Sequence, residues 1–187
     1  MAQKRKDWNG LISGFKASDL VFLDESGCNT DMTRRYADSL GGSRAVDSAP
    51  LSKPKNTTIL PSIQLDGTLR YTTFSGGTTV ERFKRYLETD LLPHLNGNSV
   101  LIMDNMKSHH AKAVRNLLDS SGVRYIYLPP YSPDLNPIEK LWSKVKSFLR
   151  KFKARTLDAL PNAIQNAFHS ITVSDCSGWF RFCGYAL

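Results

Sequence analysis

The sequence predicts an α/β protein in which helices flank a mixed central sheet. Two short apolar runs, at residues 20–24 and 99–104, have the length of strands that are buried on both faces. Alternating segments on either side of Asp66-Gly67 predict an antiparallel hairpin. The resulting order is strand, hairpin, helix, strand, helix, strand, helix, which suits a mixed sheet with helices packed on it.

Turn-forming and capping residues set the bounds of these elements. Asp66-Gly67 is a favoured two-residue hairpin turn, and the segment from Thr78 to Glu81 is a capping box that opens a helix. Gly122 closes the helix that follows. The expected elements are strands at 20–24, 57–65, 68–74, 99–104 and 123–128, an irregular segment at 29–55, and helices at 78–92, 108–121 and from 137 onward.

The last of these helices begins after residues 131–139, which read Tyr-Ser-Pro-Asp-Leu-Asn-Pro-Ile-Glu. Asn136 suits the N-cap, Pro137 suits the first helical position, and Glu139 falls at the third. Apolar residues then recur at helical spacing and form a stripe to bury: Ile138, Leu141, Val145, Phe148 and Phe152. The direction of Glu139 is therefore fixed, and its place suits either a capping box or a catalytic group.

Two further carboxylates favour the catalytic interpretation. Asp24 and Asp104 each end a buried strand, where α/β sheets bind their ligands, although either alone is also an ordinary turn residue. Three carboxylates that meet at one point repel one another unless cations neutralise them. Mg²⁺ binds one or two carboxylates together with substrate phosphate. The set predicts a metal-dependent phosphoryl-transfer site in which Asp24, Asp104 and Glu139 are both catalytic and metal-binding.

The positive charge of the chain is concentrated beside this predicted site. The formal net charge is +8, and the 137–155 segment contains only one acidic residue, Glu139. Its basic residues are Lys140, Lys144, Lys146, Arg150, Lys151, Lys153 and Arg155. A helix face of one sign next to a metal site indicates contact with nucleic-acid phosphates, whereas the alternative is mere solubilisation. We predict that Lys140, Lys144, Arg150 and Lys151 bind DNA.

Composition excludes several other classes of protein. The 187 residues leave room for one sizeable core, and a hydrophobic content of 41% is typical of a soluble globular protein. No segment approaches the roughly 18 apolar residues of a membrane span, and no apolar stretch follows the basic N-terminus as in a signal peptide. Cys28, Cys176 and Cys183 lack the paired spacing of a zinc site and indicate reduced thiols.

The acidic motifs resemble the catalytic triad of mariner-type transposases, and in particular of the bacterial insertion-sequence branch. Asp24 stands in Leu-Asp-Glu-Ser-Gly, Asp104 in Met-Asp-Asn, and Glu139 ends the nine-residue segment above. Thirty-four residues separate Asp104 from Glu139, which is the spacing associated with that branch. The resemblance covers the chain from about residue 20 to residue 185. It implies a ribonuclease-H-like catalytic domain at 20–187, preceded by a basic N-terminal extension at 1–19.

The same resemblance implies an activity and partners. The expected reaction is metal-dependent cleavage of DNA at the ends of a mobile element, followed by strand transfer, with two Mg²⁺ ions for which Mn²⁺ substitutes. The expected partners are double-stranded DNA and a second copy of the chain, with no membrane. Only nineteen residues precede Leu20, too few for the helix-turn-helix modules of complete relatives, so an upstream-encoded helix-turn-helix polypeptide is a further expected partner. The expected location is the cytoplasm, at the nucleoid when DNA is bound.

Three polar residues are secondary candidates for this site. Asn105 suits either support of a metal-bound water or phosphate, or the capping of the next turn. His109 suits either contact with a substrate phosphate or a surface or capping role. Asn136 is a candidate because it precedes the glutamate helix.

Three alternative functions remain open. The first is a catalytically idle, DNA-binding remnant of a transposase that lacks its helix-turn-helix modules. The second is a ribonuclease-H-type nuclease with another substrate. The third is an aspartyl-phosphate phosphatase with Asp24 as nucleophile, but Ser26 stands where such enzymes have a second aspartate.

Overall fold

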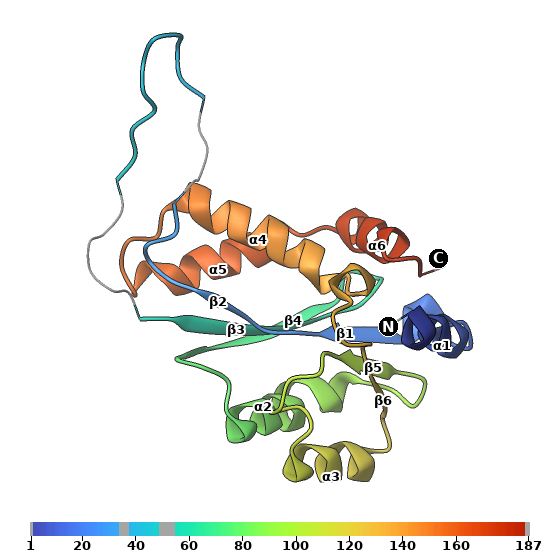
Figure 1. Cartoon of the computed structure of the whole chain (residues 1–187). Helices are drawn as coiled ribbons and strands as arrows, with labels where there is room; N and C mark the ends of the chain where they lie inside the picture. Colours follow the sequence, from blue (N-terminus) through green and yellow to red (C-terminus); the bar gives the residue numbers. More distant parts are fainter. Residues whose placement is uncertain (1, 34–37, 49–54, 186–187) are drawn as a thin grey trace.

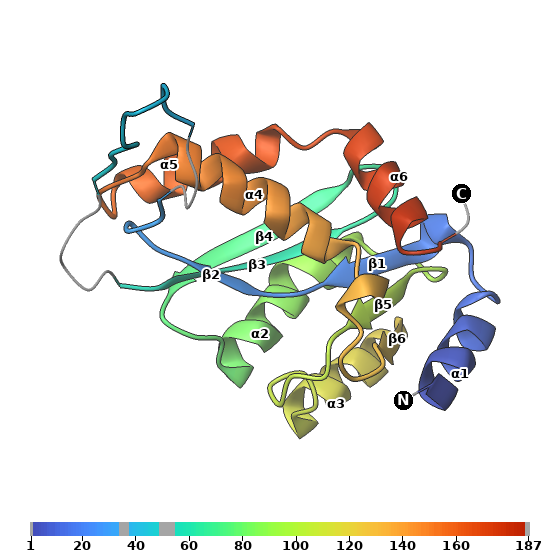
Figure 2. The same ribbon diagram turned by 45° about the horizontal axis from the view of Figure 1, so that its top comes forward.

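The computed structural model describes residues 2–33, 38–48 and 55–185 and has helices on both faces of a central sheet (Figures 1 and 2). The strands are β1 (Leu20–Leu23), β2 (Ser26–Cys28), β3 (Thr57–Ile63), β4 (Leu69–Ser75), β5 (Val100–Met103) and β6 (Arg124–Tyr127). The α-helices are α1 (Ala2–Ile12), α2 (Val80–Tyr86), α3 (Lys112–Ser121), α4 (Ile138–Phe152), α5 (Ala159–His169) and α6 (Val173–Phe182). Among the described residues, no helix is long and apolar enough to span a membrane.

The sheet is mixed, as predicted. β4 pairs antiparallel with β3 along its length, while β1 and β2 pair antiparallel with successive parts of the other edge of β3. β1 also pairs in parallel with β5, and β5 pairs in parallel with β6. The two strands that precede Asp24 and Asp104 are therefore direct neighbours at the centre of the sheet.

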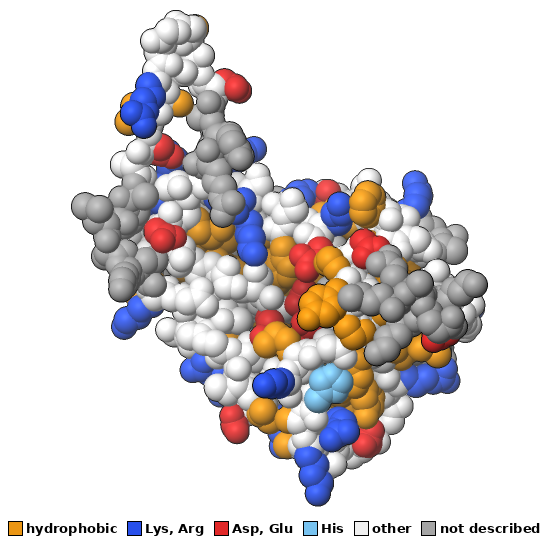
Figure 3. All heavy atoms as spheres, in the orientation of Figure 1, with side chains coloured by type: hydrophobic (Ala, Val, Ile, Leu, Met, Phe, Trp, Pro, Cys, Tyr) orange, Lys and Arg blue, Asp and Glu red, His pale blue; other side chains and the backbone are white. Residues whose placement is uncertain are grey.

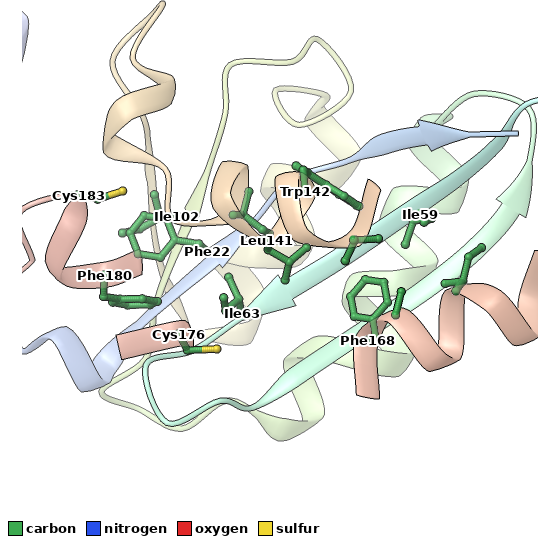
Figure 4. Packing of buried hydrophobic residues seen from close by; sticks show 14 of the residues in the cluster. Phe22, Ile59, Ile63, Ile102, Leu141, Trp142, Phe168, Cys176, Phe180 and Cys183 are labelled. Atoms are coloured by element: carbon green, nitrogen blue, oxygen red, sulfur yellow. The ribbon is translucent and has the colours of Figure 1, made fainter. Parts of the chain in front are cut away.

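Each face of the sheet has its own apolar cluster, which explains why the central strands are continuous apolar runs. On one face Phe22 packs with residues of α4, α5 and α6, and its ring meets the edge of the Phe180 ring at 5.3 Å between centroids (Figure 4). On the other face Val21 and Leu23 pack against α2 and α3, including Phe83. The site strands are thus held between two helical layers.

Several predicted element bounds are wrong, each for a local reason. Strand β2 was not predicted, because Ser26 and Gly27 have low strand propensity and the strand forms by pairing with β3. The hairpin turn has three residues, 65–67, since Gln64 and Thr68 still pair across it. Thr79 caps α2 in place of Thr78, because its side chain accepts the N–H of Arg82 at 3.3 Å. Helix α3 begins at residue 112, and residues 106–109 form a turn after Asp104.

Candidate active site

The parallel pairing of β1 with β5 puts two of the predicted acids side by side. Leu23 is in register with Met103, so the residues that follow, Asp24 and Asp104, leave the same edge of the sheet. Neighbouring strands lie about 4.8 Å apart. Two carboxylates that are eighty positions apart in the sequence therefore start from adjacent backbone positions.

The third acid reaches this edge because Asn136 joins the start of α4 to the end of β1. Its side-chain Nδ2 donates to Asp24 Oδ2 at 3.2 Å, and its Oδ1 accepts the N–H of Ile138 at 3.3 Å. A capping-box glutamate would accept the N–H of Asn136, but that N–H donates to the carbonyl of Pro133 at 3.1 Å. Helix α4 begins at Ile138 with Pro137 as its N-cap, one residue later than predicted, yet the Asn136 side chain still binds the first helical N–H. The exposed Glu139 lacks the reciprocal bond of a capping box.

All three acids line one pocket of about 440 Å³, together with Asn105, Asn136 and the 128–133 loop. Acidic side chains gather near the centre of the face seen in Figure 3, beside apolar ones. No three His, Cys, Asp or Glu side chains within the described residues are already gathered at metal-ligand spacing. The three carboxylates therefore line one pocket but do not form a complete metal site on their own.

Asp24 is buried in a negative environment. Burial is the main reason why its pKa rises to about 7, and the negative charges of Asp104 and Glu139 raise it further, against the opposing N–H of Glu25. A nearby cation would stabilise the charged form of this carboxyl group, because the cation offsets both the cost of burial and the repulsion from the other acids.

Asp104 is held by a buried histidine. His109 Nδ1 donates to Asp104 Oδ1 at 2.8 Å, and the N–H of Met106 donates to the same oxygen at 3.1 Å. Burial raises the pKa of Asp104, but the hydrogen bond and charge of His109 outweigh burial and hold that pKa below its ordinary value. Burial lowers the pKa of His109, but the hydrogen bond to Asp104 and the nearby carboxylate of Glu25 outweigh burial and raise the pKa to about 9.

The surface position expected for His109 is wrong. The side chain is 0% exposed, stacks on Phe83 at 4.2 Å between ring centroids, and has Nε2 3.9 Å from a carboxylate oxygen of Glu25. The hydroxyl of Tyr127 donates to the backbone carbonyl of His109 at 3.0 Å. His109 therefore positions Asp104 from within the core and does not face the pocket.

His109→Ala is expected to lower the free energy of unfolding by roughly 2–4 kcal/mol, because it leaves a cavity against Phe83 and removes the partner of Asp104. Urea unfolding at neutral pH measures the change. His110→Ala is the matched control, since His110 is partly exposed, stacks on Tyr127 and meets Asn105 Oδ1 at 3.3 Å, and it should cost under about 1 kcal/mol. Equal losses in the two variants would contradict the positioning role.

Asn105 serves the local structure at the pocket wall. Its Nδ2 donates to the carbonyl of Leu128, and its Oδ1 lies 3.3 Å from Nε2 of His110. These contacts join the end of β5 to the end of β6. Asn105 lines the pocket, and its side-chain amide is already occupied by these contacts with Leu128 and His110.

The four predicted DNA-binding residues differ in their contacts, and one of them, Arg150, lies on a different face of α4 from the other three. Lys144 pairs with Asp175 at 2.5 Å, and the ammonium of Lys140 lies 3.7 Å from the ring centroid of Phe182. Lys151 is exposed, while Arg150 lines a separate groove. At 100° per residue Lys140, Lys144 and Lys151 lie within about 40° of one another around α4, and Arg150 points to another face.

Sequence reasoning missed one prominent residue of the pocket. Tyr131 is 86% exposed at the pocket and has φ of 57°, a left-handed conformation that costs a non-glycine residue energy. The signal was its place at the head of the 131–139 segment, between Pro130 and Ser132. The conformation itself has no signature in the sequence.

Comparison with known proteins agrees with this geometry. The sequence profile of the DDE superfamily endonuclease family matches residues 19–161. The transposase of the transposable element Tc1 of Caenorhabditis elegans is 31% identical over 97 residues, which are 50% of this chain and 36% of that protein.

Solved structures of the Mos1 transposase share the fold. Its paired-end complex with the left transposon end superposes with a TM-score of 0.80 at 18% identity, over 95% of this chain and 57% of the Mos1 chain. The crystal structure of the Mos1 catalytic domain gives a TM-score of 0.68 at 16% identity, over 96% of this chain and 85% of that domain. The predicted ribonuclease-H-like fold is thus confirmed, while the chain spans little more than half of the full Mos1 chain. Because the family profile covers well over half of this sequence, the chain belongs to the DDE superfamily endonuclease family.

Proposed function

We propose that residues 20–187 form the catalytic domain of a transposase, preceded by a basic extension at 1–19, and that it cleaves DNA strands and joins them to a target. The observation that carries this proposal is the convergence of Asp24, Asp104 and Glu139 on one pocket in a chain of this family. The names of the relatives support it, since the Tc1 and Mos1 proteins are transposases. The motif spacing supports assignment to the bacterial insertion-sequence branch.

The residues present suit divalent metal ions. All three acids offer oxygen atoms, which Mg²⁺ and Mn²⁺ prefer, and the raised pKa of Asp24 reflects burial and, after it, neighbouring negative charge, both of which a cation would offset. Mos1 complexes with Mg and with Mn support the same ions here. Asp24 and Asp104 would be the principal ligands, and Glu139 would complete a second position. A bound pair of ions supplies charge stabilisation on both sides of the phosphate and a more acidic attacking water.

The side chains of this chain then have distinct tasks. The N–H of Glu25 and the Asn136 side chain hold the two carboxylate oxygens of Asp24, and His109 holds one oxygen of Asp104, so both carboxylates keep set directions at the pocket that they line. Glu139 is exposed at the pocket and accepts a hydrogen bond from the attacking water or DNA 3′-hydroxyl. This arrangement positions the nucleophile in line with the scissile phosphate, which is the main demand of phosphoryl transfer.

The partners follow from this activity. Double-stranded DNA is the substrate, and we expect a homodimer, because joining an element to its target involves two ends. Recognition of those ends is assigned to a helix-turn-helix polypeptide encoded upstream. The expected location is the cytoplasm, with the nucleoid, where the substrate lies.

Cleavage of supercoiled plasmid in Mg²⁺, in Mn²⁺ and in EDTA tests the proposal. We expect nicked product with either metal, none in EDTA, and none from Asp104→Asn. An RNA–DNA hybrid should be cleaved more slowly than duplex DNA. Faster cleavage of the hybrid would favour a general nuclease, and DNA binding without any cleavage would favour the idle remnant.

A further inference from the structure

Two basic residues of α4 lie on the same face of the helix as Glu139. Lys146 and Arg150 follow Glu139 by seven and eleven residues, which at 100° per residue leaves each within about 20° of it. The same rule puts Lys140 and Lys151 roughly 100–120° away around the helix. The face that carries the catalytic glutamate therefore continues as a positive stripe, whose two charges start about 10 and 16 Å further along the axis.

This stripe forms one wall of a groove of about 330 Å³. Gly27, Cys28 and Asn29 form the opposite wall, and Asp31 is the acidic residue of the lining. Both walls of the groove are connected to acids of the active site. One wall includes β2, which begins two residues after Asp24, and the other is α4, which carries Glu139 in its first turn. In Figure 3, Lys and Arg side chains lie above the central acidic group.

The two cations of the groove are not used to hold the fold together, unlike their neighbours. Lys144 and Lys153 pair with Asp175 and Asp47 at 2.5 and 2.6 Å. Arg155 donates to three backbone carbonyls, those of Thr30, Met32 and Ser48.

By contrast, Lys146 and Arg150 form no ion pair within 4.0 Å in the described part of the chain. The Lys146 ammonium lies 5.8 Å from the ring centroid of Trp142. A groove with two cations that form no ion pair, against the single acid Asp31, is complementary to a polyanion.

We propose that this groove binds the phosphate backbone of the DNA strand that leaves the active site, with Lys146 and Arg150 contacting phosphates beyond the one that is cleaved. The proposal rests on the function proposed above, and it specifies the path along which the DNA strand runs from the active site. One strand carries a charge about every 3.4 Å along the duplex axis, so the two cations would meet phosphates roughly three and five nucleotides from the scissile one.

Binding of a short DNA duplex without divalent metal, followed by fluorescence anisotropy at several salt concentrations, tests the groove independently of cleavage. The test variant is Lys146→Ala with Arg150→Ala. Its Kd should rise roughly 10- to 60-fold near 0.1 M salt, and its salt slope should shrink by about 1.8, for two lost phosphate contacts.

A matched control is Lys84→Ala with Arg85→Ala on α2, which lies on the opposite face of the sheet, and it should match the wild type (Figure 1). Lys140→Ala with Lys151→Ala tests the other face of α4. An unchanged slope in the groove variant, or a larger loss in the Lys140 and Lys151 variant, would overturn the proposal. If the alanine variant does not fold, the paired glutamine substitutions replace it.

Cleavage of duplexes with neutral methylphosphonate linkages distinguishes the two proposals. Neutral linkages about three and five nucleotides from the cut should slow the wild type and should not slow the Lys146→Ala, Arg150→Ala variant further. If the wild type cleaves but the variant responds to these linkages as the wild type does, the groove proposal fails while the transposase proposal stands. If the wild type never cleaves DNA but the binding differences persist, the transposase proposal fails while the groove proposal stands.

Discussion

Glu139→Gln is expected to lower metal-dependent DNA cleavage by roughly 10²- to 10⁴-fold while the free energy of unfolding stays within about 1 kcal/mol. The side chain is exposed at the pocket and has the same shape after substitution, so the fold loses little. Glutamine keeps a hydrogen-bonding oxygen but loses the negative charge and the capacity to accept a proton. Single-turnover cleavage and urea unfolding of the same preparation measure both quantities.

The same variant separates catalysis from helix capping. Glutamine also serves at the third position of a capping box, so a purely capping Glu139 would give unchanged cleavage. Glu88→Gln is the control, because Glu88 is an exposed helical glutamate on the opposite face of the sheet. Retained activity in Glu139→Gln would remove Glu139 from the site.

Asp24→Asn is expected to stabilise the metal-free protein at pH 8 by on the order of 2–4 kcal/mol. The folded-state pKa of Asp24 is raised to about 7, mainly by burial and then by the charges of Asp104 and Glu139. Between about pH 4 and pH 7 the folded state therefore holds this proton more tightly than the unfolded state. The wild type loses stability as pH rises through that window, and the variant lacks this loss.

Urea unfolding in EDTA at pH 5 and pH 8 measures this effect. Asp158→Asn is the control, since Asp158 is exposed and asparagine is an equally good residue at a helix start. Added Mn²⁺ at pH 8 should stabilise the wild type and leave Asp24→Asn almost unchanged, because ligand binding stabilises only a protein that binds it. A wild type whose stability is flat from pH 5 to pH 8 would contradict the raised pKa.

The sequence was sufficient for the scaffold of the site. Apolar runs that end in Asp24 and Asp104 identified two central strands, and the parallel pairing of those strands then determined where the two side chains meet. Helical spacing after Asn136 identified α4. These features depend on local patterns, which a single sequence records directly.

The remaining features depend on contacts between distant residues. The bond between Asn136 and Asp24 spans 112 positions, and the burial of His109 follows from its packing against α2. The basic run looked uniform in sequence, but Asp175 from α6 neutralises Lys144. Only the three-dimensional arrangement separates the structural cations from those that line the groove.

Anomalous diffraction from crystals grown with Mn²⁺ and a short DNA duplex tests the central claim most directly. The account predicts manganese peaks in the pocket, about 2.0–2.3 Å from carboxylate oxygens of Asp24 and Asp104, with Glu139 facing them. Manganese bound only elsewhere, or a DNA complex with no metal between these carboxylates, would contradict it.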